Sequence, residues 1–394
     1  MTAIYLNELG LVCALGQHRD DVTARLFTPA ALNALCATTE YTPGTRLALG
    51  KVNAALPNLA DQPVPWRGRN NALLQMALQP IRAAIDAAIQ RYGPHRIAVV
   101  LGTSTSGVGE SEQAHRRWRH DAQWPDTFHY AQQEIGTPAS FLRAQLGLCG
   151  PAHVISTACS SSAKALASAA RWLQAGLADA VIAGGADSLC GFTIAGFHAL
   201  SSISAERCNP FSRNRCGINI GEGAALFLLT REPAPVRLAG WGESSDAHHM
   251  SAPDPDGQGA EAAIRQALQR ARLPAKAIDY VNLHGTATRQ NDAMEAKVMH
   301  RVFGSDTPMS SSKPLTGHTL GAAGAIEAAL CWLSLTRNPQ HQLLPHVWDG
   351  EADDTLPHLN LIQPGDSSAR PQRYALSPSF AFGGSNAALV LGAE

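Results

Sequence analysis

The stretch Ala152-His153-Val154-Ile155-Ser156-Thr157-Ala158-Cys159-Ser160-Ser161-Ser162-Ala163 joins a short apolar run to a cysteine among small residues. An alanine-rich helical pattern follows, from Lys164 to Leu177. This order predicts a strand that delivers Cys159 to the first turn of a helix. Because free N–H groups and the positive dipole end at a helix start favour an anion, we expect a depressed pKa and a nucleophilic thiolate at Cys159. A small buried structural cysteine is the alternative interpretation.

Outward from this stretch, short apolar runs bounded by glycine alternate with longer helical patterns. We expect buried strands at 96–101, 152–155, 180–183 and 280–283, and helices at 70–88, 163–177 and 259–272. Such alternation predicts an α/β fold whose strands are covered by helices on both faces. The closing segment is typical of a hairpin instead, with strands at 373–380 and 387–391 around Gly383-Gly384-Ser385-Asn386.

A weak internal repeat divides the chain. The cysteine before an alanine-rich helix is echoed by Thr316-Gly317-His318 before a helical pattern at 320–335, and Arg231-Glu232-Pro233-Ala234-Pro235 interrupts the pattern between them. We therefore expect two similar halves. Residues 1–235 would carry the cysteine, and residues 236–394 would carry the histidines described below.

Composition narrows the class of protein. Of the 394 residues, 45% are hydrophobic and 16% are charged, which is typical of a soluble enzyme with a large core. The formal net charge of −1 argues against nonspecific nucleic-acid binding. Because no 18-residue uncharged apolar run and no basic leader are visible, we expect a cytoplasmic protein with no membrane insertion. The eight cysteines show no CxxC pair or metal spacing, so we expect reduced thiols and no metal.

Two segments of the second half add candidate partners for the cysteine. The first is Val281-Asn282-Leu283-His284-Gly285-Thr286-Ala287-Thr288, and the second runs from Ser312-Lys313-Pro314-Leu315-Thr316-Gly317-His318 to Glu327. Each histidine stands at the polar end of an apolar segment. With Cys159 they give one candidate nucleophile and two histidines.

Together the three segments strongly resemble the β-ketoacyl-acyl-carrier-protein synthases, the decarboxylating condensing enzymes of fatty-acid and polyketide synthesis. The resemblance covers nearly the whole chain. It implies a thiolase-like fold, with duplicated halves in five layers (α-β-α-β-α), usually as a dimer. Further motifs that carry the resemblance are 102–107, 183–187, 210–215, 221–225, 244–250 and Ser379-Phe380-Ala381-Phe382-Gly383-Gly384-Ser385-Asn386.

The resemblance also implies roles in catalysis. Cys159 matches the nucleophile, and the backbone amides of Cys159 and Phe382 match the oxyanion hole, Phe382 being also the aromatic gate of the acyl pocket. His284 and His318 match the two active-site histidines that act on the malonyl thioester. Lys313 and Glu327 match a supporting charge pair, for which a plain buried ion pair is the alternative.

Other positions match substrate-binding residues. Thr286 and Thr288 are expected to bind the phosphopantetheine arm, and Arg207 to contact the acidic acyl carrier protein. Thr105 aligns with a residue that limits acyl-pocket depth, although a simple strand-end hydroxyl is equally consistent. Ala381 departs from the usual glycine, which restricts the backbone at the gate. Because the carrier is acidic, we also expect basic residues around the pocket mouth. The candidates are Arg67, Arg69, Arg116, Arg117, Arg119, Arg207, Arg213 and Arg215.

Two acidic residues, Asp292 and Glu295, share one helix face and are expected to support the fold.

The implied activity is chain elongation with malonyl carrier protein, without a bound cofactor, because the substrates travel on the carrier's phosphopantetheine. The segments 156–162 and 218–222 look similar to synthases of bacterial aryl polyene clusters, and ordinary fatty-acid elongation is the second pathway.

Two other functions stay open. One is a chain-length-factor-like subunit, which would be active only in a heterodimer with a related ketosynthase. The presence of Cys159, His284 and His318 argues against this function. The sequence leaves open whether the dimer is a homodimer or a heterodimer. A thiolase would use coenzyme A without decarboxylation, and the segment from Lys313 to His318 argues against that.

Overall fold

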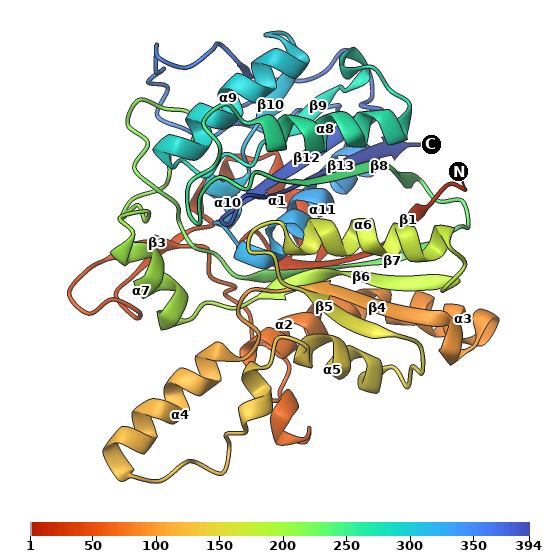
Figure 1. The fold of residues 1–394 in the computed structure, drawn as a ribbon, viewed down its shortest axis with the longest axis vertical. Coiled ribbons are helices and arrows are strands. Elements are labelled where there is room, and N and C mark those ends of the chain that lie inside the picture. Colours follow the sequence, from red (N-terminus) through yellow and green to blue (C-terminus); the bar gives the residue numbers. More distant parts are fainter. Residues whose placement is uncertain (1) are drawn as a thin grey trace.

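A computed structural model describes residues 2–394 (Figure 1). Its strands are β1 (Tyr5–Cys13), β2 (Cys36–Thr38), β3 (Leu47–Leu49), β4 (Ile97–Gly102), β5 (Ala152–Ile155), β6 (Ala180–Asp187), β7 (Gly223–Thr230), β8 (Val236–Ser245), β9 (Tyr280–Asn282), β10 (Pro308–Ser310), β11 (Asn360–Leu361), β12 (Tyr374–Ala381) and β13 (Ser385–Ala393). Its α-helices are α1 (Arg19–Leu26), α2 (Arg69–Leu78), α3 (Arg82–Tyr92), α4 (Val108–Asp121), α5 (Thr137–Gln145), α6 (Ser161–Gln174), α7 (Gly191–Ala199), α8 (Gln258–Ala271), α9 (Arg289–Phe303), α10 (Lys313–Thr316) and α11 (Ala323–Thr336).

The main sheet consists of two half-sheets joined at one point. Its strand order is β11-β10-β9-β12-β13-β8-β1-β7-β6-β4-β5. Strands β8 and β1 share a single residue pair, Tyr5 with Arg237, whereas β1 pairs with β7 along its length. The chain passes from one half to the other in the turn between the end of β7 and the start of β8.

Helices and half-sheets alternate in five layers (Figure 1). In the middle layer, α6 contacts β4 and β6 on one side and β8 and β13 on the other, and α11 likewise contacts strands of both halves. Helices α2 and α5 cover the outer face of one half-sheet, and α8 covers the outer face of the other. The thiolase-like fold expected from the sequence is confirmed.

The small and apolar residues of α6 and α11 account for the position of these two helices in the middle layer. Residues 323–334 of α11 are all buried, and α6 buries most of its alanines. A helix that is apolar or small on every side is stable only between two other layers. These helices follow His318 and Cys159 respectively, so the echo in the sequence corresponds to two equivalent helices in one layer.

Most expected elements are present, with one correction. The final hairpin is confirmed, since β12 and β13 pair without a bulge from Tyr374–Gly392 to Ala381–Ser385. The single helix expected at 70–88 is wrong: α2 ends at Leu78 and α3 begins at Arg82, with a 3₁₀ turn between them that contains Pro80. Proline has no N–H and its ring clashes with the preceding helical turn, so the helix breaks there.

Candidate active site

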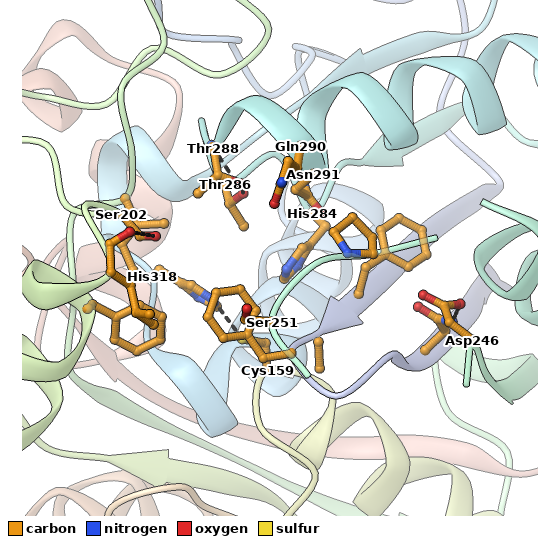
Figure 2. A pocket seen from close by; sticks show the side chains of 18 residues that line it. Cys159, Ser202, Asp246, Ser251, His284, Thr286, Thr288, Gln290, Asn291 and His318 are labelled. Atoms are coloured by element: carbon orange, nitrogen blue, oxygen red, sulfur yellow. Dashed lines mark hydrogen bonds between the residues drawn. The ribbon is translucent and has the colours of Figure 1, made fainter. Parts of the chain in front are cut away.

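Cys159 lies in a tight turn between β5 and α6. Ala158 has a φ of 50°, a left-handed conformation that costs a non-glycine residue about 1–3 kcal/mol. Hydrogen bonds hold this conformation: the Thr157 N–H donates to Ser161 Oγ at 2.8 Å, and the Ser161 hydroxyl donates to the Ala158 carbonyl oxygen at 2.6 Å. The turn places the thiol in a cavity of about 140 Å³ next to the N-terminus of α6 (Figure 2).

Both predicted histidines reach the same cavity from the other half of the chain. His318 Nε2 lies 3.0 Å from Cys159 Sγ. The His284 and His318 rings stand 5.4 Å apart with an interplanar angle of 86°, so Figure 2 shows the two imidazoles around one space above the thiol. All three side chains are buried, with at most 5% exposed. The structure therefore brings together the three residues that the sequence singled out.

The Lys313–Glu327 pair fixes the tautomer of His284. Lys313 Nζ forms a buried ion pair with Glu327 and lies 3.3 Å from His284 Nδ1. An ammonium can only donate, so Nδ1 must accept, and Nε2 must then carry the hydrogen of the neutral ring. The ion pair thus presents an N–H donor from His284 to the cavity.

Burial governs the proton affinities in this site. It raises the pKa of the Cys159 thiol to about 12, although the Lys313 charge and two backbone N–H groups oppose the shift. The expected depressed pKa is therefore wrong: Cys159 precedes the first helical turn and is enclosed by groups that exclude water. Burial, and then the charge of Lys313, hold the pKa of both His284 and His318 well below the usual value, so both rings are neutral at pH 7.

Two backbone donors converge on the sulfur. The backbone N–H groups of Cys159 and Phe382 both lower the pKa of the Cys159 thiol, which indicates that both point toward Sγ. Phe382 follows β12 and its ring lies 5.5 Å from that of Phe197 in α7, centroid to centroid. Gly384, with a φ of 71°, leaves no room for a side chain, because a Cβ there would lie 2.9 Å from Asp246 Cβ. The glycines of this loop are thus required by its backbone conformation and its close approach to the 246 segment.

The two threonines after His284 line the mouth of the cavity. Thr286 and Thr288 have hydroxyl oxygens 2.9 Å apart, and both face the cavity (Figure 2). Gln290 and Asn291, in the first turn of α9, also line it, and sequence analysis missed them. Their position immediately after the threonines was the available signal, since the start of a helix continues the same face.

Asp292 and Glu295 support the backbone that carries His284, as expected. Glu295 accepts the N–H groups of His284 and Gly285, each at 2.7 Å. Asp292 accepts the Phe211 N–H at 2.8 Å. Burial raises the pKa of Glu295 to about 8. These two acidic side chains hold the turn after β9 and do not line the cavity.

Several predicted binding residues lie away from this cavity. The Thr105 hydroxyl is buried and donates to Asp187 at 2.7 Å, as a strand-end hydroxyl would. Arg207 is partly exposed and does not line the cavity. Four rim candidates form intramolecular ion pairs: Arg69 with Glu222, Arg215 with Asp353, Arg116 with Glu112 and Arg213 with Glu351. Arg215 is buried, with 7% of its surface exposed, so it is wrong as a candidate for an exposed rim. The other rim candidates stay predictions.

The thiol and the two imidazoles also meet a geometric condition for metal binding. Their donor atoms lie within 4.8 Å of one another, a spacing seen for no other group of three or more such residues in 2–394. The ammonium of Lys313 next to His284 opposes a cation at this position.

No helix in the described part of the chain is long and apolar enough to cross a membrane.

Comparison with known proteins identifies the family. Residues 71–234 match the model "Beta-ketoacyl synthase, N-terminal domain", and residues 236–347 match "Beta-ketoacyl synthase, C-terminal domain". A chain of the ketosynthase ApeO–chain length factor ApeC complex from Xenorhabdus doucetiae is 45% identical, with a TM-score of 0.94 over 100% of this chain and 98% of that one. A β-ketoacyl synthase from Burkholderia phymatum STM815 is 29% identical, with a TM-score of 0.87 over 100% of both chains.

A relative with a similar sequence is the "Putative polyketide beta-ketoacyl synthase 1" of Streptomyces halstedii. It is 34% identical over 351 residues, which is 82% of each chain. The two matched domains, this identity and the cavity that unites Cys159 with His284 and His318 agree. The chain belongs to the beta-ketoacyl synthase family.

Proposed function

We propose that this enzyme condenses an acyl group on Cys159 with malonyl-acyl carrier protein and releases a 3-oxoacyl-acyl carrier protein and carbon dioxide. The observation that carries the proposal is the contact between Cys159 Sγ and His318 Nε2, at 3.0 Å, in a cavity that also holds the N–H of His284. A thiol with an adjacent base and nearby oxyanion donors is the arrangement that acyl transfer requires.

The first half-reaction loads the enzyme. His318 Nε2 takes the thiol proton as Sγ attacks the carbonyl carbon of the acyl-carrier thioester. The N–H groups of Cys159 and Phe382 stabilise the resulting oxyanion. When the intermediate collapses, the carrier thiolate leaves and takes the proton, so that Cys159 holds the acyl group as a thioester. A thiol with a pKa of about 12 needs such an internal base.

The second half-reaction forms the carbon–carbon bond. The Nε2–H of His284 donates to the malonyl thioester oxygen while the carboxylate leaves as carbon dioxide. The resulting enolate carbon attacks the acyl carbonyl, and the C–S bond breaks so that Cys159 leaves as a thiolate. Because His318 gave its proton to the carrier thiol during loading, the proton that restores the Cys159 thiol comes from solvent and reaches Sγ through His318 Nε2. Lys313 maintains the donor tautomer of His284 through its contact with Nδ1. We propose that Thr286 and Thr288, which line the cavity, bind the phosphopantetheine arm of the carrier.

The pathway we propose is of the aryl polyene type, with the enzyme acting in the cytoplasm as the ketosynthase subunit of a heterodimer. The likeness to the ApeO–ApeC complex supports this choice over fatty-acid elongation. That complex contains a ketosynthase and a chain length factor, so a chain-length-factor-like subunit is the second candidate. The intact Cys159, His284 and His318 set favours the catalytic subunit.

Intact-protein mass measurement after incubation with acyl carrier proteins tests this function. We expect one acyl adduct, mapped to Cys159, and a faster adduct with polyunsaturated or aryl-capped chains than with saturated chains. A preference for saturated chains would assign fatty-acid elongation. No adduct either alone or after coexpression with a chain-length-factor partner would contradict the catalytic function.

The pH dependence of loading follows from the histidine pKa. Because burial and Lys313 hold the pKa of His318 well below 6.5, the ring stays neutral and able to accept a proton as pH falls from 8 to 6. A histidine with an ordinary pKa of 6.5 would be about three-quarters protonated at pH 6. We expect the loading rate constant at saturating carrier to change less than about twofold in this range. A fall that follows an apparent pKa near 6.5 would contradict the lowered pKa of His318 and show that the ring titrates as an ordinary imidazole.

A further inference from the structure

A partly buried lysine next to the nucleophile has no role in the mechanism above. Lys164 lies in the first turn of α6, five residues after Cys159. Its Nζ donates to Ser385 Oγ at 2.6 Å, and within residues 2–394 no carboxylate lies within 4.0 Å of it. Burial lowers the pKa of Lys164, and the charge of Glu243 opposes that shift. A cation held at a hydroxyl without a carboxylate partner requires an explanation, because its desolvation is uncompensated by an ion pair.

The acceptor of this hydrogen bond also contacts the residue that follows the nucleophile. The hydroxyl of Ser160 lies 3.1 Å from Ser385 Oγ and 2.8 Å from the Thr157 carbonyl oxygen. Ser160 is fully buried. Lys164, Ser385 and Ser160 therefore form one hydrogen-bonded bridge from helix α6 to the first residue of β13.

This bridge connects the two backbone segments that carry the oxyanion donors. On one side, Ser160 directly follows Cys159. On the other side, Ser385 is paired with Ala381, the residue that precedes Phe382. The far side of the same loop is held separately, because the Asp246 N–H donates to the Gly384 carbonyl oxygen at 2.8 Å. The Gly383 N–H also donates to the Met250 carbonyl oxygen at 2.8 Å. Of these attachments, the bridge is the one that relates the Phe382 N–H to the Cys159 N–H.

We propose that Lys164 is a positioning residue of the oxyanion hole, whose ammonium fixes the Phe382 loop against the Cys159 turn through Ser385. Two donors from separate segments stabilise a tetrahedral oxyanion only if their spacing is set before the reaction. The proposal rests on the proposed function, since it concerns the loading of Cys159.

The test measures the rate of acyl loading on Cys159 for Lys164→Met, Ser385→Ala and the double variant. Samples are quenched at successive times, and the acyl adduct is quantified by intact-protein mass. We expect each single variant to lower the maximal loading rate about tenfold, with the carrier concentration at half-maximal rate unchanged. The double variant should lose no more than either single variant, because both remove one bridge. A purely structural role would lower the thermal midpoint without this selective effect on the maximal rate.

Arg171→Met is the matched control. Arg171 lies on the same helix and pairs with Glu243 on the surface at 3.1 Å, and its loss should leave loading unchanged. Loading of Lys164→Met at the wild-type rate, or additive losses in the double variant, would overturn the proposal while leaving the proposed function intact. If Lys164→Met fails to fold, Ser385→Ala against wild type still decides it. Absence of any adduct on the wild-type enzyme, both alone and coexpressed with a chain-length-factor partner, would instead refute the proposed function.

Discussion

Cys159→Ala is expected to lose condensation by at least about 1,000-fold and to form no acyl adduct. The cavity contains one sulfur, held 3.0 Å from His318 Nε2, and alanine provides no atom that can bind the acyl group. Intact-protein mass and product formation from malonyl and acyl carrier proteins measure the two losses. The effect should be the largest of any single substitution, because both half-reactions pass through the same thioester.

The matched control for this variant is Cys216→Ala. Cys216 is exposed and lies outside the cavity, so its removal should leave the adduct and the condensation rate unchanged. Retained chain extension by Cys159→Ala would refute the covalent mechanism. An adduct that is lost from the Cys216 variant would show that the acyl group had been assigned to the wrong sulfur.

His284→Ala is expected to separate the two half-reactions. It should reduce condensation by about 100- to 1,000-fold, the usual loss for one donor to a developing oxyanion. Loading of Cys159 should fall by less than about tenfold, because His318, and not His284, contacts the sulfur. Single-turnover measurements of adduct formation and of its consumption by malonyl carrier protein distinguish these rates.

Asn291→Ala provides the comparison for His284. Asn291 also lines the cavity, but its side-chain N–H groups donate to Asp292 and Glu295, so they are not free to donate to the malonyl oxygen. We expect a smaller loss in condensation, on the order of tenfold or less. Equal losses of loading and condensation in His284→Ala would contradict the assignment of His284 to the malonyl step.

The sequence was sufficient where local pattern and chain order decide the structure. Apolar runs alternating with helical patterns predicted an α/β fold, and the apolar run followed by an alanine-rich pattern predicted that a strand leads through Cys159 into a helix. The final hairpin followed from its glycine pair and flanking strands. The pattern also pointed to His284 and His318, since each stands at the polar end of an apolar segment, whereas Lys313 followed from the family resemblance.

Burial and contacts between distant segments were decided by the tertiary structure. The helix position of Cys159 predicts a lowered pKa, yet enclosure by residues from both halves raises it. The partner of Thr105 is Asp187 and the partner of Lys164 is Ser385, neither of which is near in sequence. Local patterns determine which element a residue joins, because they reflect backbone geometry over a few residues. Desolvation and hydrogen-bond partners depend on which elements pack together, and only the folded chain fixes that.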